Sequence, residues 1–168
     1  MIELPAAVPP PSGTGGERAV LEGFLEQYRT IVVRKAAGLD EESSRRRLVG
    51  SLTTVAGLIK HLRWVEQAWF VEVLEGNPRP DWRDTDPDWQ FRLDPDDNLT
   101  ALISDYQAAC ERSRRIAVTH DLDDTGTHPR LGVVSLRWIY AHMLEELARH
   151  GGQLDILREQ LDGEVGFD

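Results

Sequence analysis

Apolar residues recur every three or four positions in four long segments of the chain, which is the spacing of an amphipathic helix. These segments are residues 17–37, 53–75, 96–119 and 135–161. Gly38 follows the first segment and Gly163 follows the last, where glycine commonly ends a helix. We find no segment with the convincing alternation of apolar and polar residues that is typical of strands. The pattern therefore predicts an all-α fold, a four-helix bundle with long connections between helices.

The connections between these segments are unequal in length. Residues 77–94 contain Trp82 and Trp89 but no helical pattern, and residues 120–132 form a second long connection. A connection as long as the first often covers an active site, although its tryptophans could simply pin a solvated loop to the helices. Residues 1–16 are rich in proline and glycine. We therefore predict a flexible leader over 1–16 and a single domain over 17–168.

The net charge and the distribution of apolar residues argue against some classes of binding partner. The chain has 168 residues and a net charge of −10, which argues against nucleic acid or an anionic membrane as the partner. No stretch approaches the ~20 apolar residues of a membrane span, and the first 16 residues lack the features of a secretory signal. We therefore expect a cytoplasmic protein that acts on a small-molecule substrate.

Cys110 is the one cysteine of the chain, which excludes an internal disulfide. It lies in an apolar helical stripe, so we predict a buried and inert thiol. A reactive thiol is the alternative, and it would need an accessible and electropositive setting.

The residues with the clearest chemistry are Glu146 and His150, which lie four positions apart and therefore on one helical face. Their stripe also holds Met143, and burying a carboxylate and an imidazole there is costly unless something binds them. His61 lies on an apolar face of the second segment. Two histidines and a carboxylate suit Zn(II), Fe(II) or Ni(II), and three protein ligands leave a position open for catalysis. The alternatives are a core histidine at position 61 and a solvated face at Glu146, whereas Glu145 should face solvent.

Other residues of these segments are candidates for supporting roles. His142, one turn before Glu146, is the nearest candidate general base, with a structural histidine as the alternative. We expect Trp64, Trp69 and Gln153 to contact a bound cofactor or substrate. The pair Gly151–Gly152 lowers helix propensity, which suggests close approach by a neighbouring helix or a bound molecule.

The segments 58–66 and 149–159 resemble the DinB/YfiT-like superfamily of metalloenzymes, and 161–166 resemble its actinobacterial members. The resemblance spans nearly everything after the leader. It implies that His61, Glu146 and His150 hold one divalent metal. The usual set is three histidines, and glutamate at the middle position is the variant of the mycothiol-dependent maleylpyruvate isomerases.

The resemblance implies a metal-dependent enzyme that uses a low-molecular-weight thiol such as mycothiol for isomerisation or S-transfer on a small organic substrate. Zinc is the expected metal, with nickel and iron as alternatives. A metal-dependent hydrolase with His142 as base and a non-catalytic metal-binding stress-response protein are the competing hypotheses. Trp138 beside Arg137 on an already amphipathic helix suggests surplus apolar surface, so we also expect a homodimer.

Overall fold

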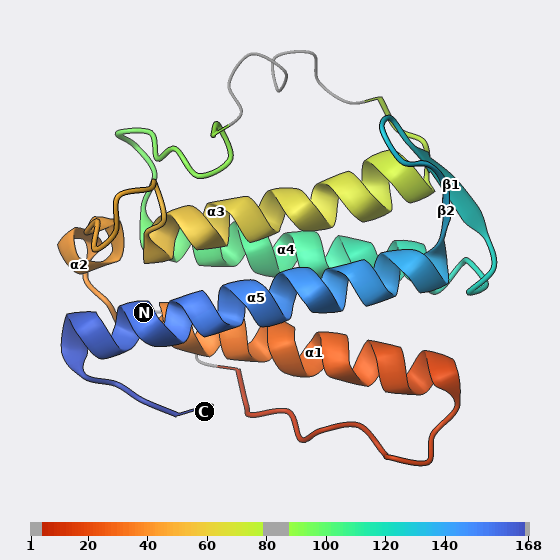
Figure 1. The fold of residues 1–168 in the computed structure, drawn as a ribbon, viewed down its shortest axis with the longest axis horizontal. Helices are drawn as coiled ribbons and strands as arrows, with labels where there is room; N and C mark the ends of the chain where they lie inside the picture. Colours follow the sequence, from red (N-terminus) through yellow and green to blue (C-terminus); the bar gives the residue numbers. More distant parts are fainter. Residues whose placement is uncertain (1–4, 79–87, 167–168) are drawn as a thin grey trace.

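The computed structural model describes residues 5–78 and 88–166, and this part of the chain is mostly helical (Figure 1). Its elements are α1 (Glu17–Ala36), α2 (Glu41–Arg45), α3 (Val55–Glu66), the π-helix η1 (Gln67–Leu74), α4 (Leu99–Ala117), β1 (Thr125–His128), β2 (Gly132–Ser135) and α5 (Leu136–Asp162). The π-helix continues α3 without a break. The four helical segments predicted from the periodicity are therefore confirmed, with ends that shift by a few residues.

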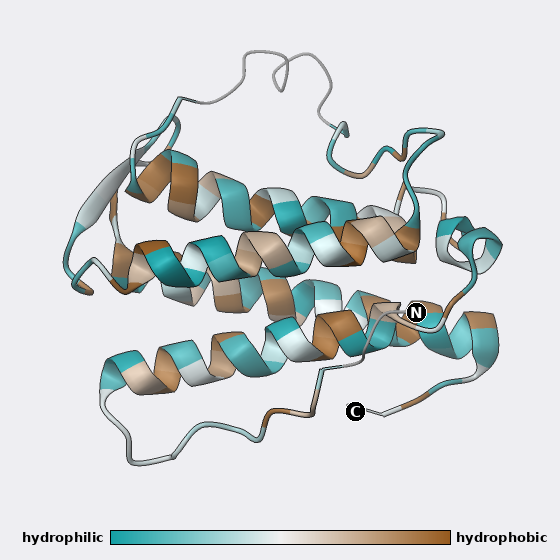
Figure 2. Ribbon diagram, turned by 180° about the vertical axis from the view of Figure 1, so that it is seen from behind, coloured by the Kyte–Doolittle hydropathy of each residue, from teal (hydrophilic) through white to brown (hydrophobic). Residues whose placement is uncertain are grey.

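The long helices lie side by side, with α1 packed mainly on α5 and α3 packed mainly on α4 (Figure 1). Apolar and polar residues are distributed around each helix in stripes (Figure 2). The apolar stripes meet in one core, where Leu58, Ile103, Met143 and Leu147 are fully buried. Burial of this surface is the main force that holds the helices together.

Side-chain caps fix where the helices begin. The side chain of Thr54 accepts a hydrogen bond from the Gly57 amide at the start of α3, and Ser135 accepts one from the Trp138 amide at the start of α5. Such caps satisfy backbone donors that have no partner within the helix. Gly163 ends α5 with a φ of 77°, the left-handed conformation that favours glycine.

A small antiparallel hairpin joins α4 to α5, so the prediction that the chain lacks strands is wrong. In the hairpin β1 pairs with β2 from Thr125 opposite Ser135 to His128 opposite Gly132. Each strand has only four residues, too few for alternation to stand out in the sequence. A side chain on Gly126 would clash with the Val73 backbone, whose carbonyl carbon lies 2.6 Å from the position of a Cβ. The hairpin therefore sits directly against η1.

A buried ion pair links α1 to α3. Arg29 donates to both carboxylate oxygens of Glu66 at 2.8 and 2.7 Å, and both side chains are buried. Cys110 on α4 donates to Glu66 at 3.6 Å. The prediction of a buried thiol is confirmed, and burial, followed by the adjacent Glu66 carboxylate, raises the pKa of Cys110 well above its usual range.

Residues before α1 run along that helix, where the carbonyl of Pro5 accepts a hydrogen bond from Arg34 at 2.9 Å. The division into a flexible leader and one domain stays a prediction. Within the described residues, we see no helix with the length and apolar character needed to cross a membrane.

Candidate metal centre

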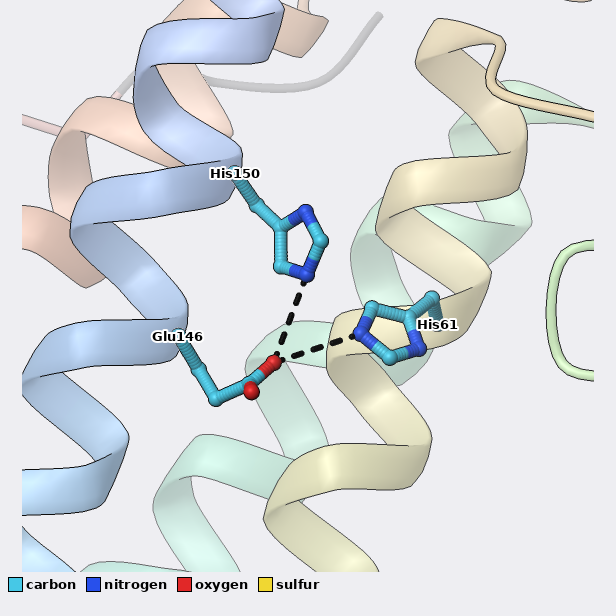
Figure 3. A group of neighbouring side chains, drawn as sticks. All are labelled: His61, Glu146 and His150. Atoms are coloured by element: carbon cyan, nitrogen blue, oxygen red, sulfur yellow. Dashed lines mark ion pairs between the residues drawn. The ribbon is translucent and has the colours of Figure 1, made fainter. Parts of the chain in front are cut away.

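Three side chains from two helices converge on one point (Figure 3). His61 comes from α3, and Glu146 and His150 come from α5. The Oε2 atom of Glu146 lies 3.5 Å from Nε2 of His61 and 3.3 Å from Nε2 of His150. One ligand atom from each residue falls within 4.8 Å of the others, so this cluster could hold a metal ion.

Helical geometry explains this convergence. Glu146 and His150 lie one turn apart on α5, on the face that packs toward α3. Both histidines are only 7% exposed. The side chain of Glu145, 57% exposed, points away from the candidate ligands, pairs with Arg149 at 2.9 Å and lies 3.5 Å from Nδ1 of His142. The two neighbouring glutamates therefore occupy the different faces that the spacing predicts.

Each histidine is oriented by a glutamine. Nδ1 of His61 lies 3.0 Å from Oε1 of Gln90, and Nδ1 of His150 lies 2.8 Å from Oε1 of Gln153. An amide oxygen only accepts hydrogen bonds, so each Nδ1 carries the proton and donates it. Each Nε2 then presents a lone pair toward Glu146, which is the arrangement of metal-ligating histidines.

The segment that carries Gln90 is attached to α3. Lys60 donates to the carboxylates of Asp94 and Asp97 at 2.8 and 2.7 Å. The Phe91 ring stacks on the imidazole of His61 with ring centroids 4.3 Å apart. The end of the long connection is thereby held beside the candidate ligands.

The carboxylate charge and the nitrogen lone pairs of the cluster favour the binding of a cation. Two Nε2 lone pairs and a carboxylate face one another, and within the described residues Nε2 of His61 has no hydrogen-bond partner. Where His150, and next His61, carries a proton at Nε2 in place of a metal, its hydrogen bond and positive charge lower the pKa of Glu146 well below its usual range, so this group stays a carboxylate. Ligand bonds of ~2.0–2.1 Å in a tetrahedral zinc site give ligand separations of about 3.3 Å, close to the distances of 3.5 and 3.3 Å from Glu146 to the two histidines. The donor set therefore fits a divalent metal.

A cavity of about 730 Å³ opens beside the cluster. His61 and Glu146 line it, so the candidate centre is reached from this cavity. Trp64, Trp69 and Trp89 line it as well, and the Trp64 and Trp89 rings meet edge to face at 4.9 Å. A cavity of this size with aromatic walls suits a small organic molecule.

The model of one family, mycothiol S-transferase, matches residues 20–163. The chain belongs to the mycothiol S-transferase family. The match includes the three candidate ligands and the cavity residues described here, and it confirms the resemblance to the DinB/YfiT-like superfamily. A search of curated proteins gives no match to this chain.

In this mycothiol S-transferase family member, His142 lies next to the candidate ligands. Its Nε2 is 3.8 Å from Oε1 of Glu146, and its ring stacks on Trp138 with centroids 5.1 Å apart. Trp69 meets the same ring edge to face at 4.6 Å. His142 lines the cavity, so it is placed to contact a bound molecule.

The structure places Gln153 behind His150, and Gln153 is not among the described residues that line the cavity. The Gln153 side chain contacts His150, a candidate ligand, whereas Trp64 and Trp69 line the cavity itself. The sequence analysis did not identify Gln90 as a site residue. The only feature of Gln90 visible in the sequence is its place in the long connection, residues 77–94. Trp82 lies outside the described residues.

The expectation of close approach at Gly151 and Gly152 is not supported by the structure. A Cβ at Gly151 would have one ordinary contact, 4.0 Å from the Tyr28 ring, and a Cβ at Gly152 would have none within 4 Å. Buried Gly151 therefore faces Tyr28 of α1 at ordinary contact distance, and neither position is so close to a described residue that only glycine fits.

Proposed function

We propose that this protein is a divalent-metal-dependent mycothiol S-transferase that joins the thiol sulfur to a small electrophilic organic substrate. The observation that carries the proposal is the convergence of two Nε2 lone pairs and a carboxylate on one point at the wall of an aromatic cavity. Membership of the mycothiol S-transferase family supports the choice of thiol.

Different residues would bind the metal, accept the thiol proton and hold the organic substrate. His61, Glu146 and His150 would hold the metal, which would bind the thiol as a thiolate and lower its pKa. His142, whose Nε2 lies 3.8 Å from Oε1 of Glu146, would accept the thiol proton. Trp64 and Trp69 would hold the organic substrate against the cavity wall, so that the sulfur reaches an electrophilic carbon.

Zinc suits two imidazoles and a carboxylate with one position left open, and nickel and iron remain alternatives. Isomerisation would require the same thiolate to add to the substrate and then leave again. We also assign the chain to the DinB/YfiT-like four-helix bundles, which the packing of α1 on α5 and of α3 on α4 supports. Action as a cytoplasmic homodimer completes the proposal.

The test compares two neighbouring glutamates in protein purified without an affinity tag. Glu146→Ala should lose both bound metal, measured by elemental analysis, and mycothiol-dependent turnover of an electrophile such as monobromobimane. Glu145→Ala, the matched control, should keep its metal because its carboxylate points away from the candidate ligands, and its turnover reports separately on the 3.5 Å contact between Glu145 and Nδ1 of His142. Full turnover in metal-free wild-type protein, or equal metal loss in both variants, would overturn the proposal.

The same preparation separates the competing hypotheses. A hydrolase would turn over an ester without any thiol. A non-catalytic protein would bind metal and gain thermal stability, but would accelerate neither reaction. Thiol-dependent turnover that disappears with a chelator and returns with zinc is the expected result.

A further inference from the structure

The cationic side chain of Arg130 lies in the wall of the cavity. Among the described residues that line the cavity, Arg130 is the one lysine or arginine. It occupies the turn between β1 and β2, which precedes α5 and lies far along the chain from α3 and His61. The hairpin, which the sequence did not predict, therefore adds a positive charge to this cavity.

The turn that carries Arg130 is held in place. Nδ1 of His128 accepts hydrogen bonds from the backbone amides of Arg130 and Leu131, each at 3.2 Å. The ring of His128 stacks on Trp69 with centroids 4.9 Å apart and an interplanar angle of 16°. Close packing of Gly126 on Val73 fixes the strand before the turn. The Arg130 backbone is therefore positioned by contacts with the cavity wall.

No described residue pairs with the side chain of Arg130. The nearby Arg137, by contrast, donates to Glu17 at 2.7 Å and also pairs with Asp123. A guanidinium matches the geometry of a carboxylate and binds it with two parallel hydrogen bonds. The chain has a net charge of −10, which repels anionic molecules. The positive charge of Arg130 would therefore favour entry of an anionic substrate into the cavity.

We infer that Arg130 binds a carboxylate of the substrate, so that this protein prefers small acidic electrophiles over their neutral counterparts. The turnover part of this inference rests on the proposed function. The binding preference for a carboxylate does not, because it depends only on the residues that line the cavity. Arg130 acts here as a specificity-determining residue, and the thiol chemistry takes place at the metal centre.

A binding experiment tests the preference without any reaction. We would titrate 4-nitrobenzoate and 4-nitrobenzamide into the protein without thiol and follow quenching of tryptophan fluorescence. Wild-type protein should bind the benzoate roughly tenfold more tightly, the effect of a guanidinium–carboxylate pair that is partly exposed to solvent. Arg130→Gln should remove this preference, and Arg130→Lys should restore part of it. Arg115→Gln, which removes an exposed charge from α4, should leave it unchanged.

The titration is repeated on metal-free and zinc-loaded protein. A preference that survives Arg130→Gln in zinc-loaded protein but vanishes without zinc would place the carboxylate on the metal and overturn the inference. Equal binding of the two probes by the metal-free wild-type protein would also overturn it. Neither result depends on whether the protein is an S-transferase.

A turnover experiment uses iodoacetate and iodoacetamide with mycothiol as the thiol. In both reactions the sulfur forms a bond to the methylene carbon, the carbon–iodine bond breaks, and iodide and the thiol proton are released. The ratio of kcat/KM for iodoacetate to that for iodoacetamide should fall roughly tenfold in Arg130→Gln. An equal loss for both electrophiles would overturn the inference, whereas no turnover of either by wild-type protein would count against the proposed function alone.

Discussion

Two glutamine side chains determine which nitrogen each candidate histidine ligand presents to the centre. The side-chain oxygens of Gln90 and Gln153 each accept a hydrogen bond from Nδ1–H of a histidine, so the Nε2 atoms face Glu146. Replacing either glutamine by alanine frees the imidazole to rotate or to change tautomer. We expect Gln153→Ala and Gln90→Ala each to weaken zinc binding by about 10–100-fold, measured by competition with a chromogenic chelator.

Gln160→Ala is the matched control for this prediction. Gln160 is exposed on α5, the helix that carries Gln153, and its removal should leave zinc affinity unchanged. Unaltered affinity in both test variants would mean that the glutamines do not control the ligands. A loss in Gln153→Ala alone would show that only the hydrogen bond within α5 matters.

The buried pair of Arg29 and Glu66 has a large expected effect on stability. Truncating Arg29 leaves an uncompensated carboxylate that is fully buried, together with its Cys110 donor. We expect Arg29→Ala to lower the free energy of unfolding by about 3–5 kcal/mol in urea titrations. Arg115→Ala, which removes an exposed partner of Glu111, should change it by less than about 1 kcal/mol. Similar values for both variants would contradict the assignment.

At the scale of elements, the hairpin depends on one glycine. Any side chain at Gly126 would meet the Val73 backbone, which cannot move without distorting η1. We expect Gly126→Ala to displace the hairpin and lower stability by roughly 1–3 kcal/mol. The turn with Arg130 would move with it, so binding of acidic probes should weaken while zinc affinity is retained.

Gly152→Ala on α5 is the control for Gly126→Ala, and it should have the opposite effect on stability. A methyl group there meets open space in a helix, so stability should rise by up to ~1 kcal/mol. Thermal melts of both variants beside wild type decide the comparison. A melting temperature for Gly126→Ala equal to or above that of wild type would show that the hairpin tolerates the methyl group.

Features of this fold that extend over many periodic residues could be predicted from the sequence, whereas short or aperiodic features could not. The long helices follow from periodicity over many residues, and Glu146 with His150 follows from helical spacing within one of them. The four-residue strands are too short for such a pattern. The π-helical form of η1 leaves no mark, because its apolar residues are spaced as in an α-helix. Gln90 lies 29 positions from His61 in a connection without period, so only the folded chain brings them together.

At the scale of the whole molecule, apolar surface remains on the hairpin and the start of α5. Val133 on β2 is 71% exposed, and Leu131 beside it is 56% exposed. Trp138 is 40% exposed although it packs on Trp69 and His142. We expect this surface to be covered in a homodimer. Sedimentation at micromolar concentration measures the mass, and a single species at 19.0 kDa would contradict the dimer.

The candidate centre also has a consequence for how the chain comes apart. Its candidate ligands lie on α3 and α5, with residues 62–145 between them, so a bound ion would close half of the chain into one loop. Such a cross-link reduces the entropy of the unfolded chain wherever the ion stays attached, in the way a disulfide does. α3 and α5 could then separate only after an ion–ligand bond breaks. Metal would thus slow unfolding itself, and the lifetime of the folded protein would follow the supply of metal in its surroundings.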